Sequence, residues 1–351
     1  MPQPLREDLM DRLAELRRHV APGAKGIEIA PYFNPVVPKS AGYDVLIVDV
    51  FDTDRLRQNA SLDPKIPDSR IAEIEPVDIV CDASNLGSEV DRLGLTGKID
   101  YIISSHNFEH LPDPIRFMKG CGLALRPGGM LTMAIPDYRA CFDHYRMPTR
   151  LTDWLSAYQE GRSQPSPASI FDFLAHFSQR SAGGQVLETC QIERDDPSGF
   201  APTRDFAQLY SDYLGRLSEP KGYEDIHCST VFGELFELLM LELRYLGLID
   251  LEVAQVTRTH GHEFFAHLAK AAPGAAPMPR DVFDSRRLEL LKIVNANLGS
   301  AVFSNRPWQM PRLHVVAKRV FAAIVGAGAA NRLRKWNHAR KARRKPPASA
   351  A

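Results

Sequence analysis

Long hydrophobic runs are absent from this chain of 351 residues. The apolar run at 320–330 holds eleven residues, whereas a helix needs about 20 to cross a bilayer. The first twenty residues carry charges throughout and lack the apolar segment of a secretory signal. These absences predict a cytoplasmic protein.

Cysteine is scarce, and the five cysteines, at 81, 121, 141, 190 and 228, form no C-x-x-C pair. This spacing suits a reducing compartment and argues against a structural zinc site. Three histidines gather at His260, His262 and His267, but no cysteine accompanies them and they read as ordinary hairpin residues. We therefore predict no metal ligands.

Net charge is also absent, since 43 basic residues balance 43 acidic ones. Eight of the basic residues lie between Arg332 and Lys345, a stretch without acids, so the preceding 331 residues carry 35 basic against 43 acidic side chains, a formal charge of −8. A body of this charge predicts no nucleic-acid binding, which needs a basic face. The basic tail follows an apolar segment at 315–330 and carries Trp336, a combination that suits peripheral contact with an anionic membrane. A solvated tail after a docked helix is the alternative.

What is present begins with two apolar runs, at 26–30 and 43–48, separated by a proline-containing loop. The second run ends on Asp49. A strand, a loop and a second strand with a carboxylate at its tip are how open α/β sheets hold a ribose. The loop lacks G-x-G-x-x-G, so a pyrophosphate cradle and a nicotinamide cofactor are not predicted. A nucleoside-like ligand without a pyrophosphate fits better.

At this stretch the sequence resembles the class I S-adenosylmethionine-dependent methyltransferases. Their first strand reads acidic-x-Gly-x-Gly, and a branch with a proline-containing first loop comes close to Glu28-Ile29-Ala30-Pro31. Ala30 stands where that branch usually has glycine. The resemblance implies S-adenosylmethionine as cofactor, with the ribose held by Asp49 and the sulfonium beside Ala30. The alternative for Glu28 and Asp49 is a structural role as capped strand ends.

Two further segments carry the resemblance. A third strand at 77–81 ends on Asp82-Ala83, a pair placed like the methyltransferase residues that meet adenine, although an Asx turn or helix cap is an equal interpretation of Asp82. After a fourth strand at 99–104 comes the run Ser104-x-x-x-x-Glu109-His110-x-x-Asp113-Pro114, which closely resembles the fourth-strand motif of small-molecule methyltransferases. The cofactor-binding residues implied are Glu28, Ala30, Pro31, Asn34, Asp49, Val50, Asp82, Ala83, Ser105 and His106.

Three segments after residue 125 complete the fold prediction. Gly128-Gly129 leads into a fifth strand at 130–135, and two strands at 251–256 and 263–269 are joined too closely to be anything but antiparallel. We predict an α/β fold, a doubly wound, Rossmann-like and mostly parallel seven-stranded sheet with an antiparallel last strand. A helical insertion and a helical C-terminal extension accompany it.

The predicted domains follow from these segments. The methyltransferase core comprises residues 1–138 and 228–272. Residues 139–227 are a helical insertion, either a substrate lid or a structural addition. Residues 273–351 are a helical C-terminal extension with the basic tail.

Three residues are candidates for a general base: His106, Asp137 and His227. His106 is preferred because it directly follows the fourth strand, near the expected methyl group, and because an unshifted imidazole titrates near neutral pH. A structural role in holding the loop is an alternative for Glu109 and the favoured interpretation of His110. The branch with this proline loop resembles one associated with glycan modification, so O-methylation of a small-molecule or sugar hydroxyl is predicted. A non-catalytic methyltransferase-like binding or scaffold protein is the alternative.

Overall fold

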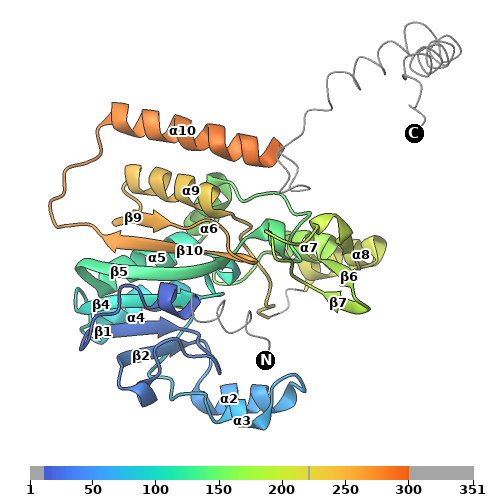
Figure 1. The fold of residues 1–351 in the computed structure, drawn as a ribbon, viewed down its shortest axis with the longest axis horizontal. Coiled ribbons are helices and arrows are strands. Elements are labelled where there is room, and N and C mark those ends of the chain that lie inside the picture. The colour runs from blue at the N-terminus through green and yellow to red at the C-terminus, as the bar shows by residue number, and fades with distance from the viewer. Residues whose placement is uncertain (1–11, 220–221, 300–351) are drawn as a thin grey trace, which may run out of the picture. The chain divides into compact units, whose positions relative to one another are not determined.

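The computed structural model describes residues 12–219 and 222–299 of the chain (Figure 1). Its centre is a seven-stranded sheet in the order β3-β2-β1-β4-β5-β10-β9. Strands β1 to β5 are parallel, and β10 runs antiparallel to both β5 and β9. The strands are β1 (Lys25–Ile29), β2 (Asp44–Asp49), β3 (Ile79–Val80), β4 (Ile99–Ser105), β5 (Leu125–Pro136), β9 (Leu251–Val256) and β10 (Glu263–Lys270).

This order confirms the predicted fold class. The strand order reverses where β1 lies beside β4, and in open α/β sheets ligands bind in the crevice beyond the carboxyl ends of the strands at such a reversal. The ends of β1 and β4 are therefore where a site is expected.

Alternating side chains along the strands build a core on each face of the sheet. In β4, Ile102 packs in one apolar cluster while Tyr101 and Ile103 pack in another, as a period of two requires. The first cluster includes residues of α4 (Leu86–Arg92), α5 (Pro114–Ala124) and α9 (Gly233–Tyr245). The second is closed by Leu16, from the helical turns at 12–16, and by Val36 and Val37.

A tight crossing of α4 and α5 supports one prediction on stability. A Cβ added to Gly120 would lie 2.7 Å from the backbone nitrogen of Gly87, so Gly120→Ala forces the two helices apart. We expect a loss of about 1–3 kcal/mol in the free energy of unfolding, because overpacking of a close core contact has this cost. Urea denaturation measures it, with exposed Lys119→Ala as the control, and equal stabilities of the two variants would contradict the predicted close approach.

The insertion at 139–227 holds more than helices. Its helices are α6 (Leu151–Glu160), α7 (Pro167–His176) and α8 (Phe206–Ser218), and a small sheet has the order β7-β6-β8. β6 (Ser178–Ala182) and β7 (Gln185–Leu187) are joined by Gly183-Gly184, both with positive φ, while β8 spans Ala201–Pro202. This glycine pair forms a two-residue hairpin turn of the type that positive φ permits.

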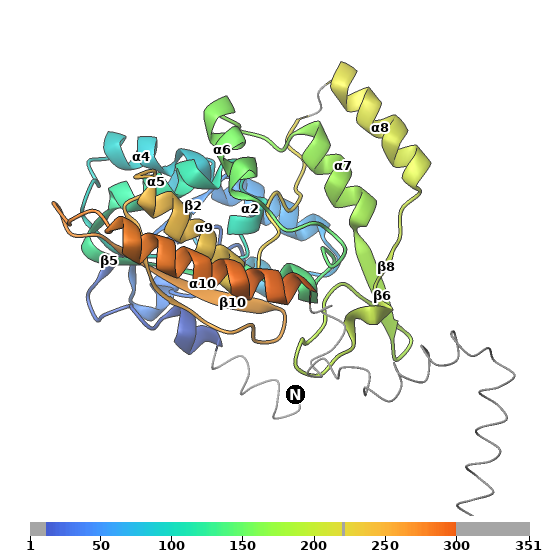
Figure 2. The same cartoon turned by 90° about the horizontal axis from the view of Figure 1, so that it is seen from above.

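Other differences are local. The third strand, predicted at 77–81, pairs over two residues only. The segment between β2 and β3 holds α2 (Thr53–Leu62) and the short helix α3 (Asp68–Ile71). Helix α10 (Arg280–Gly299) lies along α9, where the rings of Tyr245 and Phe283 stack at 3.7 Å (Figure 2).

The apolar segment at 315–330 and the basic tail lie outside the described residues. Among the residues described, no helix is both long enough and apolar enough to cross a membrane.

Candidate active site

One hollow lies at the carboxyl ends of the parallel strands, and we call it the strand-end pocket. Ala30 follows β1, Asp49 ends β2, Asp82 and Ala83 follow β3, and Asn107 follows β4. Four separate connections thus meet around one space. The pocket is lined by Ile29, Ala30, Val48, Asp49, Val50, Cys81, Asp82, Ala83, Asn107, His110, Leu111, Pro112 and Tyr223.

Asp49 is the buried carboxylate of this pocket. It is only 6% exposed, and its Oδ1 accepts a hydrogen bond from the Phe51 backbone N–H at 3.0 Å. Burial raises the pKa of Asp49, while the N–H groups of Phe51 and Val50 act in the opposite direction. A carboxylate held at a strand tip in this way can accept hydrogen bonds from the two hydroxyls of a ribose.

The backbone beside the pocket is strained. Ala30, Tyr32 and His106 have φ of 48°, 50° and 50°, and they are the non-glycine residues with positive φ in the described ranges. L-residues reach this left-handed region at a cost of roughly 1–2 kcal/mol each. Such strain tends to gather at functional sites, and Ala30 takes the backbone conformation that a glycine would adopt at this position.

A second hollow, here called the groove, joins the pocket at Ile29 and Ala30. It contains six of the residues predicted from the sequence, Glu28, Ala30, Pro31, Asn34, Ser105 and His106. Its remaining lining residues are Arg12, Leu13, Ile29, Tyr32, Phe33, Pro35, Pro38, Ser40, Arg57, Arg70, Ala72, Glu73, Ile74, Glu75 and Pro76.

Glu28 braces the loop that lines the groove. Its carboxylate accepts hydrogen bonds from the backbone N–H groups of Val36 at 2.6 Å and Val37 at 3.1 Å. Burial raises the pKa of Glu28 to about 7 against the opposing effect of those N–H groups. Glu28 borders the groove but not the strand-end pocket, which favours the structural alternative that the sequence left open.

His106 lies between two carboxylates. Its Nε2 is 2.7 Å from Glu263 Oε2 and its Nδ1 is 3.5 Å from Glu109 Oε1, while Arg12 donates from Nε to Glu263 Oε1 at 2.7 Å. Burial lowers the pKa of His106, but the neighbouring carboxylates of Glu109 and Glu263 outweigh it and raise the pKa to about 9. The prediction of an unshifted pKa for His106 is therefore wrong. Glu263 lies far away in the sequence and Glu109 belongs to the turn after β4, so neither was expected to contact the imidazole.

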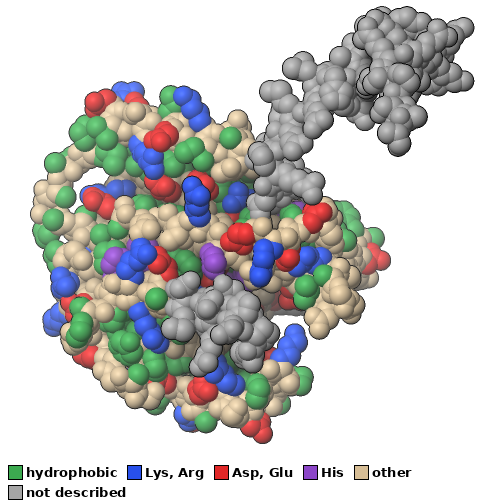
Figure 3. All heavy atoms as spheres, in the orientation of Figure 1, with side chains coloured by type: hydrophobic (Ala, Val, Ile, Leu, Met, Phe, Trp, Pro, Cys, Tyr) green, Lys and Arg blue, Asp and Glu red, His purple; other side chains and the backbone are tan. Residues whose placement is uncertain are grey.

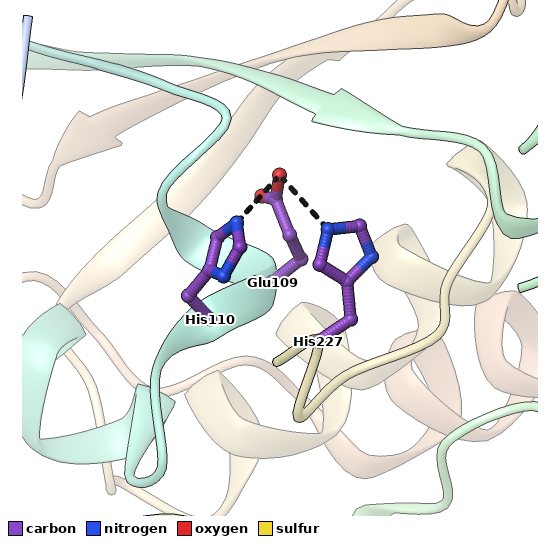
Figure 4. A group of neighbouring side chains, drawn as sticks. All are labelled: Glu109, His110 and His227. Atoms are coloured by element: carbon purple, nitrogen blue, oxygen red, sulfur yellow. Dashed lines mark ion pairs between the residues drawn. The ribbon is translucent and has the colours of Figure 1, made fainter. Parts of the chain in front are cut away.

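Glu109 lies between two further histidines, His110 and His227 (Figure 4). Its Oε1 lies 3.8 Å from His110 Nε2 and 3.9 Å from His227 Nε2, and the side chain is 1% exposed. Burial raises the pKa of this carboxyl, but the histidines around it lower the pKa more, so the net shift is downward. Glu109 and His110 therefore point into a polar cluster, which their interpretation as loop residues did not anticipate.

Asp137 is placed differently from the prediction. It is fully buried, its Oδ2 lies 2.6 Å from Arg139 Nη2, and it accepts a hydrogen bond from Thr259 Oγ1 at 2.6 Å. It borders neither the pocket nor the groove. This geometry favours a structural role, in which Asp137 ties the end of β5 to the turn between β9 and β10.

The insertion contributes Tyr223 to the strand-end pocket. Its hydroxyl donates to Asp225 Oδ1 at 3.2 Å, and the chain then continues to His227 and to Cys228, whose backbone N–H donates to the Glu109 carbonyl at 2.6 Å. No sequence signal pointed to Tyr223, since its position depends on the return of the chain from the insertion. The segment 222–228 thus borders the strand-end pocket and also contributes His227 to the cluster that contains Glu109 and His110.

Charges of both signs are mixed over the surface around these elements. In the face shown in Figure 3, Lys and Arg side chains alternate with Asp and Glu, and no broad area of one sign covers the described residues. The visible part of this face therefore has no continuous basic area of the kind that a nucleic acid needs.

Comparisons with known proteins agree with this geometry. Residues 15–181, just under half of the chain, match the family model described as a methyltransferase domain. No curated protein sequence matches the chain.

Solved structures similar to the chain include two described as S-adenosylmethionine-dependent methyltransferases. The one from Methanosarcina mazei is 14% identical, with 74% of this chain and 97% of that chain covered and a TM-score of 0.35. The one from Mesorhizobium loti is 13% identical, with 75% and 97% covered and a TM-score of 0.35. A 1,6-didemethyltoxoflavin-N1-methyltransferase from Burkholderia thailandensis is 10% identical, with 76% and 79% covered and a TM-score of 0.31. At these values the likenesses carry no argument about activity.

The domain match spans the strand-end residues Ala30, Asp49, Asp82 and His106. The sheet order places Ala30, Asp49 and Asp82 around the strand-end pocket at the reversal of strand order, and His106 borders the adjoining groove. The match of residues 15–181 to a methyltransferase domain supports an enzyme whose cofactor is S-adenosylmethionine.

Proposed function

We propose that this enzyme methylates a hydroxyl oxygen of a small molecule, with a sugar or glycan hydroxyl as the first candidate. The observation that carries this proposal is the polar groove that meets the strand-end pocket at Ala30. Arginines and carboxylates line the groove beside Tyr32 and Phe33. Charged hydrogen-bonding groups next to aromatic faces suit a ligand that carries hydroxyls on one side and C–H groups on the other.

The strand-end pocket fits an adenosine. Asp49 would accept hydrogen bonds from the ribose hydroxyls, and Asp82 with the backbone of Ala83 would meet the adenine ring. The positive φ of Ala30 turns the chain away from β1 and leaves room for the methionine part. Bound here, S-adenosylmethionine would supply an activated methyl group.

The residues of the chain would mainly align the acceptor. Holding two reacting groups in the right orientation is worth about 7–11 kcal/mol of a reaction barrier, and a positioned base adds a factor of roughly 10²–10⁴. Of the three candidate bases, His106 borders the groove, whereas Asp137 and His227 border neither hollow. We therefore assign His106 to the acceptor side of the site.

The insertion would act as a lid. Tyr223 borders the pocket from the segment 222–228, opposite the strand ends that carry Asp49 and Asp82. Closing this segment over the ligand would exclude water from the reacting groups.

An acceptor screen tests the proposed function. The full-length chain is incubated with S-adenosylmethionine and matched sets of sugars, oligosaccharides, phenols and amines, and products are identified by the mass of an added methyl group. We expect methyl ethers of hydroxyl compounds. Methylation of amines alone would contradict the proposal of O-methylation while leaving the enzyme class intact.

Ala30 gives a prediction on cofactor binding. Ala30→Gly should leave the free energy of unfolding within about 1 kcal/mol of wild type, since relief of backbone strain offsets the freedom that glycine adds to the unfolded chain. Ala30→Val should abolish detectable binding of S-adenosylhomocysteine, because a β-branched residue resists positive φ and its methyls enter the pocket. Calorimetry and thermal unfolding measure both effects, with Ala24→Val just before β1 as control. Equal affinities of the two Ala30 variants would contradict the placement of the ligand beside Ala30.

A further inference from the structure

Three imidazole rings converge on one buried carboxylate oxygen. Glu109 Oε1 lies 3.5 Å from His106 Nδ1, 3.8 Å from His110 Nε2 and 3.9 Å from His227 Nε2. Figure 4 shows the Glu109 carboxylate between the rings of His110 and His227, with a nitrogen of each ring turned toward it. Glu109 and His110 come from the turn after β4, and His227 comes from the segment that leads into α9.

Each ring has a second carboxylate on its far side. This carboxylate is hydrogen-bonded to the ring in the case of His106 and His227, and it lies within ion-pair distance of the ring in the case of His110. These outer contacts join His106 Nε2 to Glu263 at 2.7 Å, His110 Nδ1 to Asp225 at 2.8 Å and His227 Nδ1 to Asp143 at 2.5 Å. A histidine whose outer nitrogen donates to a carboxylate presents the lone pair of its inner nitrogen. This is how histidines that bind metals are held in proteins.

The inner contacts are too long for hydrogen bonds of good geometry. Both oxygens of Glu109 are buried without a hydrogen-bond partner, although the described chain surrounds them with nitrogens. Burying a carboxylate without hydrogen bonds lowers the stability of the folded chain. Ligands that bind zinc at about 2.0–2.2 Å lie roughly 3.0–3.5 Å from one another, so shifts of about half an ångström would bring these atoms to a common cation.

We propose that Glu109, His110 and His227 bind one divalent transition-metal ion, for which zinc is the best match. Their ligand atoms lie within 4.8 Å of one another. Imidazole and carboxylate ligands suit zinc and its neighbours rather than magnesium or calcium. Two histidines and one glutamate form the ligand set of zinc sites that keep an open position. His106 offers a further nitrogen at the edge of the same site.

A neighbouring group, Cys141, Asp143 and His227, is less suited to hold the ion. Asp143 Oδ1 is already paired with Arg146 Nη1 at 2.9 Å, and Asp143 Oδ2 contacts His227 Nδ1. The Cys141 thiol donates to Asp143 Oδ2 at 3.6 Å, as a neutral thiol does. Asp143 therefore orients His227, and a cation there would have to displace an arginine.

The position of the site suggests what the ion does. His110 borders the strand-end pocket and His106 borders the groove. An ion between them would lie near the junction of the two hollows, with an open position toward the acceptor. Resting on the proposed function, we infer that the ion holds the acceptor hydroxyl through its oxygen, so the favoured acceptors have a hydroxyl beside a second oxygen that can complete a chelate.

Metal binding is tested on the full-length chain without cofactor or acceptor. After removal of metal with a chelator and dialysis, zinc is titrated by calorimetry and cobalt by visible absorption. We expect one ion per chain. Glu109→Gln and His227→Gln should each weaken binding at least 100-fold, and Asp143→Asn should weaken it about 10- to 100-fold because it frees the ring of His227. His260→Gln, on the turn between β9 and β10, is the matched control and should bind as wild type.

The outcomes separate this proposal from the proposed function. A wild-type chain that takes up no ion, or a folded Glu109→Gln variant with unchanged affinity, would overturn the metal site whatever the acceptor screen shows. A thiolate-to-cobalt absorption band that disappears in Cys141→Ala would also overturn it, by moving the ion to the neighbouring group. Failure of every hydroxyl acceptor would remove the role of the ion in methylation but leave the measured binding in place.

Discussion

Replacing Asp49 by asparagine should weaken binding of S-adenosylhomocysteine about 10- to 150-fold. The substitution keeps the size of the side chain and the oxygen that accepts from Phe51 N–H, but it removes the charge. A hydrogen bond to a charged group contributes about 1.5–3 kcal/mol, which corresponds to that range of dissociation constants. Calorimetry on the two purified chains measures the difference.

The matched control lies on the same strand. Asp44→Asn, at the exposed amino end of β2, makes the same chemical change far from the pocket and should leave the affinity unchanged. Equal affinities for wild type and Asp49→Asn would mean that the ribose is not held by the tip of β2.

Replacing His106 by alanine should lower turnover about 10- to 1,000-fold while the dissociation constant for S-adenosylmethionine stays within a few-fold. The ring borders the groove and is fixed by Glu263 at 2.7 Å, so its removal takes a positioned proton-transfer group from the acceptor side. Single-turnover kinetics with a hydroxyl acceptor, together with cofactor titration, separates the two quantities.

His262→Ala is the control for this change. The rings of His262 and His106 are 5.7 Å apart, and His262 borders neither the pocket nor the groove, so its loss should alter turnover by less than threefold. If His106→Ala instead loses cofactor affinity without a specific effect on turnover, His106 belongs to the cofactor side of the site.

The convergence of Asp49 and Asp82 on one pocket could be predicted from the sequence because it depends on local pattern. Asp49 ends one apolar run and Asp82 follows another. Both runs are predicted as parallel strands, so both residues are expected at the edge of the sheet where the carboxyl ends of the strands lie. The structure puts them in one pocket with Ala30, as the resemblance implied. The order of the parallel strands along the chain was enough to predict that Asp49 and Asp82 lie close together.

The polar cluster could not be predicted in the same way. Glu109 contacts His227, and His106 contacts Glu263, but these pairs are far apart in the sequence and no spacing rule joins them. The pKa of His106 depends on those contacts, so the expectation of an unshifted imidazole failed with them. Tyr223 likewise reaches the pocket only because the insertion returns to it.

Asp137 shows the limit of arguments from strand ends. It follows β5 directly, as a crevice residue would, yet Arg139 two positions later turns back to pair with it and Thr259 donates to it. A carboxylate at a strand tip is available to a ligand only when no nearby cationic side chain forms an ion pair with it. Arg139 is that cation, two residues further along the chain.

The central claim is that an adenosine-bearing cofactor occupies the strand-end pocket with its ribose on Asp49. Isothermal titration calorimetry of S-adenosylhomocysteine against the full-length chain tests this most directly. We predict one site per chain with a micromolar dissociation constant, weakened by Asp49→Asn and unchanged by Asp44→Asn. A folded wild-type chain that gives no binding heat at any temperature tried would contradict the assignment of the pocket and favour a non-catalytic scaffold.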